Sequence, residues 1–230
     1  MQLEPAPAIP LWALPLLFLT GLVAGFVDSI AGGGGLITVP VLLCFPIPRQ
    51  FALGTNKLQA TFGSGSAAWH YAQMDIVKPR ECLAGVIFTV IGAAAGTLFV
   101  QSLSDQLLRR VIPIALLAIA TYMIFKPKFG AQDGHARLST KWFYPLAGLT
   151  LGFYDGFLGP GTGSFWAVAF ILGLGFNLVK ATGYTKVMNF ASNLTSLAVF
   201  AIGGRMYYAA GLTMGVGQLL GARAGSRMVA

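Results

Sequence analysis

The feature of this sequence that most limits its fold is a series of apolar segments, several of them about 20 residues long, joined by short polar links. A helix of that length is enough to cross the roughly 30 Å hydrocarbon core of a bilayer. Hydrophobic residues make up 56% of the chain and charged residues 10%, which leaves too little polar surface to cover a water-soluble globule. We therefore predict an all-α membrane protein, a helical bundle that spans the bilayer several times.

The apolar segments form two sets on either side of a polar linker. The first set occupies residues 11–30, 36–45, 51–73, 82–100 and 107–125. The second set occupies residues 142–158, 165–175, 181–203 and 206–222. We predict residues 1–125 as a first transmembrane repeat, residues 126–141 as a connecting loop and residues 142–230 as a second repeat. By this division, the second repeat lacks the last span of the first.

The two sets match each other in order, which indicates an internal duplication. Asp28 aligns with Asp155 and Lys57 aligns with Lys186, and both residue types are rare inside spans. We therefore predict two homologous repeats. They are inverted if each opens with a hairpin of two crossing segments, because each complete repeat then has an odd number of crossings. They are parallel if the short second segment enters the membrane without crossing it.

The basic residues favour the inverted arrangement with the N-terminus outside. The net charge of +8 is spread over short connections rather than gathered in a basic helix, so topology explains it better than a nucleic-acid partner does. In this orientation most basic residues lie in the cytoplasm: Lys78, Arg80, Lys126, Lys128, Arg137, Lys141, Lys180, Arg223 and Arg227. The remainder of this set lies outside: Arg49, Arg109, Arg110 and Arg205.

The most distinctive motif is a run of glycines that follows Asp28, with a second glycine-rich stretch after Asp155. The glycines of interest are Gly32, Gly33, Gly34 and Gly35, and in the second stretch Gly159 and Gly161. Each glycine costs about 1 kcal/mol relative to Ala inside a helix, so we predict broken or re-entrant helices at both places. Matching breaks in two repeats point to a transporter's binding site, and backbone N–H groups at a helix start favour an anion. The alternative is that the glycines only let helices pack closely.

Two lysines lie inside predicted spans among other polar residues. The first cluster is Thr55, Asn56, Lys57 and Gln59, and the second is Thr185, Lys186 and Asn189. Each lysine lies roughly 9 Å along its helix, so its side chain could still reach the interface. The polar neighbours favour a path for an ion or a substrate, and a cationic, amide-rich pocket suits an oxyanion.

The two aspartates have more than one interpretation. Asp28 and Asp155 could carry protons, because an acid in a low dielectric can exchange a proton near neutral pH. They could equally cap the short helices or pair with the lysines. A serine hydrolase dyad of Ser64 and His70 is disfavoured, since six residues place them roughly 120° apart on a helix. We therefore expect no catalytic residues, no metal site and no cofactor.

These motifs in combination resemble the TauE/SafE family of sulfite exporters. The resemblance rests on residues 25–40 and 52–57 and on the weaker copy in residues 148–186, and it covers nearly all of the chain. It implies a bacterial inner-membrane protein that moves sulfite, sulfonates or related organosulfur anions. It also implies roles for Asp28, the glycine run, Thr55, Asn56, Lys57, Asp155, Gly159, Gly161, Thr185, Lys186 and Asn189. Pro160 and Thr162 depart from the glycine pattern of the second copy.

We predict a secondary transporter of a small anion that works by alternating access, with the bilayer and the anion as its partners. Homodimerisation through small-residue helix faces is a further possibility. The alternative function is a non-transporting membrane scaffold or assembly protein. A channel is disfavoured, because no ring of charges or carbonyls is evident.

Overall fold

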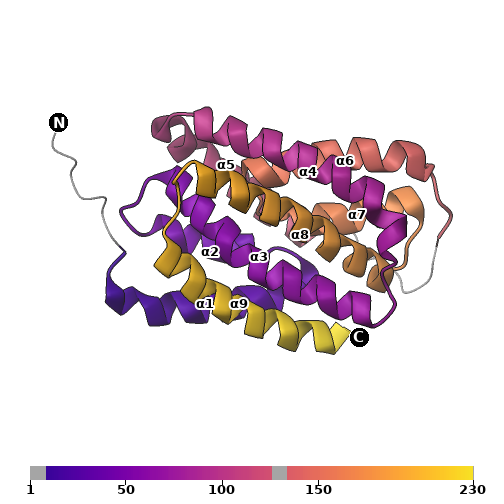
Figure 1. Ribbon diagram of the computed structural model, residues 1–230, viewed down its shortest axis with the longest axis horizontal. Helices are drawn as coiled ribbons and strands as arrows, with labels where there is room; N and C mark the ends of the chain where they lie inside the picture. Colours follow the sequence, from indigo (N-terminus) through magenta and orange to yellow (C-terminus); the bar gives the residue numbers. More distant parts are fainter. Residues whose placement is uncertain (1–8, 126–133, 230) are drawn as a thin grey trace.

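The computed structural model describes residues 9–125 and 134–229, and Lys126, Lys128 and the rest of 126–133 in the predicted linker lie outside these ranges. Within them the regular structure is helical, which confirms the all-α prediction (Figure 1). The first half contains η1 (Leu11–Ala13), α1 (Leu14–Ala31), α2 (Gly35–Leu43), α3 (Arg49–Gln73), α4 (Pro79–Ser102) and α5 (Asp105–Phe125). The second contains α6 (Thr140–Phe157), α7 (Thr162–Leu174), α8 (Leu178–Ile202) and α9 (Tyr208–Val229).

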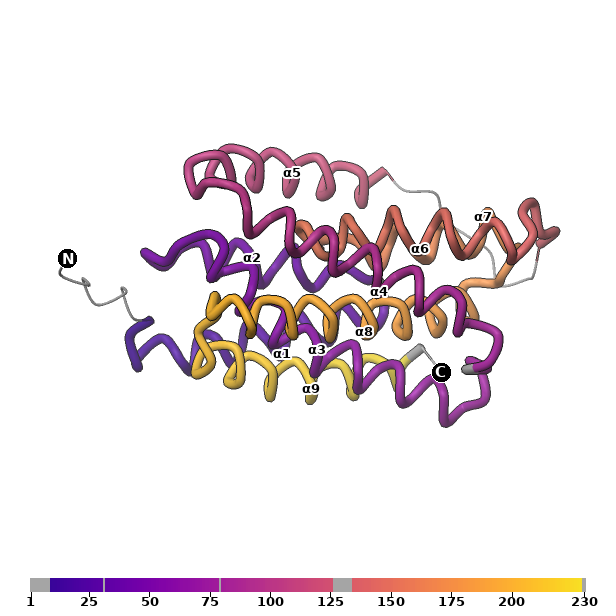
Figure 2. Tube along the Cα trace, turned by 45° about the horizontal axis from the view of Figure 1, so that its top comes forward, coloured from indigo at the N-terminus to yellow at the C-terminus, as the bar shows by residue number. Residues whose placement is uncertain are grey.

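Three stretches of the described chain are long and apolar enough to cross a membrane. They are Leu11–Ile30, Arg80–Ser102 and Asp105–Phe125. The helices α3 and α8 have 25 residues each, and both carry the buried lysines and amides of the two polar clusters. Figure 2 shows that α5 lies along the outside of the bundle, and only 17% of its apolar window is buried. The polar helices are therefore inside and the apolar ones outside, as expected in lipid.

The helices run in two opposite directions. In α1 and α9, Gly21 lies against Met214 and Gly25 against Gln218, so these two helices are parallel. In α4 and α6, Gly148 lies against Thr89, and the later contacts follow in the same order. Figure 1 shows α3 running away from the N-terminal end of the bundle and α8 running back towards it. Helices at corresponding positions of the two halves thus point in opposite directions.

Close glycine contacts hold these parallel pairs together. A Cβ on Gly92 of α4 would overlap the Leu149 carbonyl of α6, and a Cβ on Gly221 of α9 would overlap the Leu22 carbonyl of α1. Gly92 aligns with Gly221, and Leu149 aligns with Leu22, so the same contact occurs at both places. Small residues of this kind let helix backbones approach in lipid, where tight van der Waals packing drives association.

The Gly221→Ala variant is expected to unfold at a lower temperature, because its new methyl group meets backbone that cannot rotate away. Overpacking of this kind costs about 1–3 kcal/mol. Gly134→Ala is the control, since its nearest neighbour beyond its own chain segment is the Gly175 Cα at 3.9 Å. Thermal unfolding in detergent measures both variants, and equal melting temperatures would contradict this account of α1–α9 packing.

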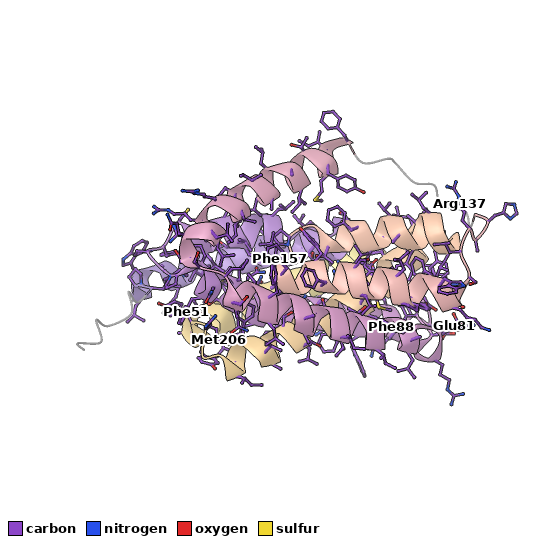
Figure 3. The ribbon with its side chains drawn as sticks, turned by 90° about the horizontal axis from the view of Figure 1, so that it is seen from above. Phe51, Glu81, Phe88, Arg137, Phe157 and Met206 are labelled. Atoms are coloured by element: carbon purple, nitrogen blue, oxygen red, sulfur yellow. The ribbon has the colours of Figure 1, made fainter. Side chains whose placement is uncertain are left out.

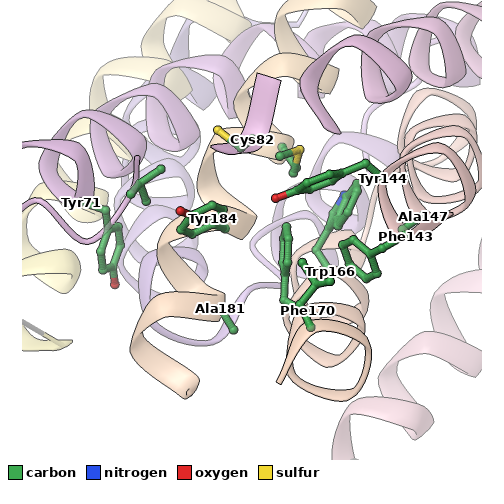
Figure 4. Packing of buried hydrophobic residues seen from close by; sticks show 12 residues of the cluster. Tyr71, Cys82, Phe143, Tyr144, Ala147, Trp166, Phe170, Ala181 and Tyr184 are labelled. Atoms are coloured by element: carbon green, nitrogen blue, oxygen red, sulfur yellow. The ribbon is translucent and has the colours of Figure 1, made fainter. Parts of the chain in front are cut away.

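An aromatic cluster fills the end of the bundle where α3 joins α4 (Figure 4). The rings of Trp166 and Phe170 stack with centroids 5.3 Å apart, and Tyr184 packs edge-on against Phe170. The Tyr184 hydroxyl donates a hydrogen bond to the Glu81 carboxylate at 2.8 Å. This cluster joins α7 and the start of α8 to α6 and the start of α4.

Basic residues are distributed unevenly between the two ends. One end holds the α3–α4 turn, the start of α6 and the C-terminus of α9, with Lys78, Arg80, Arg137, Lys141, Lys180, Arg223 and Arg227. The opposite end holds Arg49, Arg109, Arg110 and Arg205. The described part of the chain therefore has the charge asymmetry that the sequence indicates.

Candidate functional site

The first helix breaks within the glycine run. The chain leaves α1 after Ala31, and Gly32 and Gly33 have φ values of 68° and 129° before α2 begins at Gly35. Residues that carry a Cβ rarely adopt such positive φ values, whereas glycine adopts them freely. The interruption that the glycines predict is therefore present, and its cause is the backbone freedom of Gly32 and Gly33.

The second half breaks at the corresponding place. The helix α6 ends at Phe157, Gly159 and Gly161 have φ values of 94° and 78°, and α7 begins at Thr162. The two residues that depart from the glycine pattern stabilise this turn. The Pro160 carbonyl accepts a 2.6 Å hydrogen bond from the Tyr154 hydroxyl, and the Thr162 hydroxyl donates to the Gly159 carbonyl at 2.6 Å.

The two breaks meet inside the bundle. A Cβ built on Gly32 would lie 2.9 Å from the backbone of both Gly163 and Ser164, and one on Gly35 would lie 3.1 Å from the Pro160 Cα. The Ser164 hydroxyl donates to the Gly32 carbonyl at 3.4 Å. Two segments far apart in the sequence thus touch through glycine surfaces, with no room for larger side chains between them.

Lys57 crosses from α3 to the break of the second half. Its Nζ donates to the Asp155 carbonyl at 2.5 Å, to Asp155 Oδ1 at 2.7 Å and to Asn193 Oδ1 at 3.3 Å. The Lys57 and Asp155 side chains are only 2% and 4% exposed. The other Asp155 oxygen, Oδ2, accepts a hydrogen bond from the Ser192 hydroxyl. This is a buried ion pair with every charged group bonded.

Lys186 makes the reciprocal connection from α8 to the first half. Its Nζ donates to the Asp28 carbonyl and lies 3.2 Å from Asp28 Oδ2. The Lys186 side chain is 1% exposed, so it does not extend to the membrane interface. Each lysine therefore bonds both the carbonyl and the carboxylate of the aspartate that precedes the other half's break.

Asp28 also caps its own break. Its Oδ1 accepts hydrogen bonds from the backbone N–H groups of Gly33 and Gly34, at 3.0 and 3.1 Å. The sequence suggested that these N–H groups are available to an anion, but the carboxylate one turn earlier already occupies them. Capping and lysine pairing, the two structural interpretations of Asp28, are thus both present at once.

A small cavity of about 30 Å³ lies between the breaks and the polar faces of α3 and α8. This volume is far below the roughly 300–1,000 Å³ of an ordinary ligand pocket. Its lining includes the predicted residues Asp28, Gly33, Gly35, Asn56, Lys57, Asp155, Gly159, Gly161 and Asn189. The structure thus brings most of the predicted site residues around one space.

The other predicted residues lie behind this lining. The Thr55 hydroxyl accepts from the Tyr207 N–H at 2.9 Å, and Gln59 Nε2 donates to Asn56 Oδ1 at 2.8 Å. Lys186 reaches the cavity only through Asp28. The predicted residues outside the lining are Gly32, Gly34, Thr55, Gln59, Thr185 and Lys186.

The comparison with protein families decides the assignment. The model of the family described as "Sulfite exporter TauE/SafE" matches residues 17–230. The chain belongs to the TauE/SafE family. This is a family of membrane transporters rather than of enzymes, so the protein is a membrane transporter of the TauE/SafE family.

Curated relatives agree with this assignment. A "Probable membrane transporter protein" of Haemophilus influenzae is 47% identical over 94% of this chain and 85% of its own length. The "Probable membrane transporter protein YfcA" of Escherichia coli K12 is 44% identical over 94% of this chain and 80% of its own length. "ORF9" of Sinorhizobium, with the same description, is 44% identical over 93% and 82%. No solved structure shows significant similarity to the chain.

Several polar residues of this TauE/SafE site were not predicted from the sequence. Asn193 and Gln218 line the cavity, and Ser192 bonds Asp155 from outside it. Asn193 lies four residues after Asn189, on the same face of α8, which is a spacing that could have revealed it. Gln218 is an amide in an otherwise apolar part of α9, and such a lone polar residue in a span is itself a signal.

Proposed function

We propose that this protein is a multi-pass secondary transporter of a bacterial inner membrane that moves a small oxyanion, sulfite or a sulfonate, by alternating access. The observation that supports this proposal most is the reciprocal pairing of Lys57 and Lys186 with the aspartates before the two helix breaks. These pairs lie around a cavity whose lining includes several amides. The description of the family as sulfite exporters supports the choice of anion. Ionisable residues this deep in a membrane protein are costly and mark ion or substrate paths.

The lining explains how an oxyanion would be held. The Lys57 ammonium and the amide NH₂ groups of Asn56, Asn189 and Asn193 supply the donors that an oxyanion requires. An arriving anion competes with the Asp155 carboxylate for Lys57. Two lysines and two aspartates form a neutral set, so an anion enters most easily together with a proton on one aspartate. The proposal therefore includes proton coupling.

The two halves supply the movement. Their opposite helix directions and recurring glycine contacts support inverted repeats related by a two-fold axis, the architecture of many secondary transporters. The cavity of about 30 Å³ is far smaller than an ordinary ligand pocket of roughly 300–1,000 Å³, so in this proposal the anion enters when the breaks separate. Met123 and Ile119 of α5 lie on Gly33 and Gly161, so α5 covers this junction. The end of the bundle that carries more Lys and Arg residues faces the cytoplasm.

Uptake by proteoliposomes tests this function. Purified protein is expected to accumulate labelled sulfite in vesicles, and unlabelled sulfonates such as sulfoacetate are expected to compete. Because the anion enters with a proton, uptake should rise when the outside of the vesicles is made more acidic than the inside. This stimulation should vanish when the proton gradient is collapsed. Transport of none of sulfite, thiosulfate, sulfoacetate and sulfate, by protein that remains folded, would contradict the proposal and favour a scaffold.

A further inference from the structure

A groove of about 590 Å³ lies between the C-terminal half of α5 and the helices α6 and α7, and it shares no lining residue with the oxyanion cavity. Figure 3 shows α5 diverging from α6 towards this end, with Arg137 labelled at the end of the opening. Its lining is Tyr122, Arg137, Leu138, Phe143, Leu146, Ala147, Thr150, Leu151, Phe165, Val168, Ala169, Leu172 and Gly173. Apolar side chains make up most of this surface.

The groove opens sideways to the surroundings of the bundle. Leu146 and Leu172 on its rim are 63% and 43% exposed, whereas Phe143 at its floor is 2% exposed. The buried residues of α5 are Leu108, Ile112 and Ile119, all before the groove begins. In the C-terminal part of α5, Tyr122 packs against Phe165 with ring centroids 5.1 Å apart. An apolar hollow that opens laterally from a transmembrane bundle faces lipid, not water.

A basic side chain, that of Arg137, lies at one end of the groove. The backbone N–H groups of Arg137 and Leu138 donate to the Gly173 carbonyl at 2.9 and 3.0 Å, which fixes the segment before α6 over the end of α7. The Arg137 guanidinium has no acidic partner among residues 9–125 and 134–229. It lies at the end of the bundle that carries the excess of Lys and Arg, which marks the cytoplasmic surface.

The length of the groove matches one leaflet. Its lining runs from Phe143 to Leu151 along α6 and from Phe165 to Gly173 along α7. Eight residues of helix span about 12 Å, and half of the hydrocarbon core is about 15 Å thick. The hollow therefore extends from the level of Arg137 to near the middle of the bilayer, which is the depth of a single acyl chain.

We propose that this groove is a binding site for an anionic phospholipid of the cytoplasmic leaflet. One acyl chain lies along the apolar floor between α5 and α6–α7, and the phosphate contacts the Arg137 guanidinium. Basic residues between transmembrane helices on the cytoplasmic side bind anionic headgroups in this way. The bound chain fills the gap that separates α5 from α6, so the lipid supports the helix that covers the two breaks.

Native mass spectrometry with matched lipids tests the site. Protein purified in detergent is titrated with phosphatidylglycerol or with phosphatidylcholine of identical acyl chains, and the retained lipid is counted. The wild-type protein is expected to retain several-fold more phosphatidylglycerol. Arg137→Gln is expected to remove this preference, whereas Arg227→Gln, an exposed arginine on α9 at the same end, is expected to keep it.

A second variant tests the acyl chain. Leu146→Trp places a large ring at the exposed rim and is expected to lower the retention of phosphatidylglycerol several-fold without unfolding the protein. Equal retention of the two lipids by the wild-type protein would overturn the proposal. A preference that survives Arg137→Gln, or retention that is unchanged in folded Leu146→Trp, would overturn it as well.

Discussion

Replacing Lys57 with Met is expected to abolish sulfite uptake and to lower the free energy of unfolding by about 3–5 kcal/mol. The Asp155 side chain is 4% exposed, and without the ammonium group the Ser192 hydroxyl is its one remaining hydrogen-bond partner among the described residues. A buried charge that loses its partner is strongly destabilising, because nothing replaces the lost attraction or hydration. Thermal unfolding in detergent and vesicle uptake measure the two effects separately.

The double variant Lys57→Met/Asp155→Asn distinguishes a structural from a functional role. Neutralising both partners removes the unpaired charge, and such replacements are often close to neutral for stability. We therefore expect the melting temperature to recover while uptake stays lost, since the cavity then lacks its cation. Wild-type uptake by this folded double variant would show that Lys57 only holds the halves together.

Lys186→Met provides the matched comparison from the other half. Its partner Asp28 is 17% exposed and retains the N–H groups of Gly33 and Gly34 after the lysine is removed. The loss of stability should therefore be smaller than that of Lys57→Met. An equal or larger loss would mean that the two ion pairs do not differ in the way that their hydrogen bonds indicate.

Replacing Gly32 with Ala is expected to have the second large effect, because this residue is constrained twice. Its φ of 68° is strained for any residue with a Cβ, at about 1–3 kcal/mol. The new methyl group would also lie 2.9 Å from the Gly163 and Ser164 backbone, and overpacking adds about 1–3 kcal/mol. The variant should melt at a lower temperature and lose uptake, because the two breaks can no longer touch.

Gly204→Ala is the matched control for the strain alone. Gly204 has a similar φ of 64°, but among the described residues no atom beyond its own chain neighbours lies within 4 Å of its added Cβ. Its melting temperature should fall less, and its uptake should remain near the wild-type rate. If both variants behave alike, contact between the breaks contributes nothing, and backbone strain explains the whole effect of Gly32→Ala.

The helix breaks could be predicted from the sequence because their cause is local. Four consecutive glycines disfavour a helix whatever surrounds them, and the structure has positive φ values at Gly32 and Gly33. The polar positions of α3 could be recognised in the same way, since Lys57 stands beside Thr55, Asn56 and Gln59 in a predicted span. Local chemistry of this kind needs no knowledge of the neighbours.

The partners of these residues could not be predicted, because they depend on how the halves pack. Lys57 pairs with Asp155 rather than with Asp28, and no spacing in the sequence distinguishes the two. The use of the Gly33 and Gly34 N–H groups by Asp28 was hidden for a similar reason, since it depends on the path of the turn. The relative directions of the helices also depend on tertiary contacts, such as that of Gly21 with Met214.

The most direct test of the proposed anion site is to locate a bound anion in a crystal. Selenite has the shape and charge of sulfite, and its selenium atom is located by anomalous diffraction from soaked crystals. We expect one anomalous peak between the two helix breaks, with an oxygen within hydrogen-bond distance of Lys57 Nζ, in a cavity larger than the present one of about 30 Å³. Selenite bound only elsewhere, with the Lys57–Asp155 pair intact and the cavity unchanged in size, would contradict the proposed site.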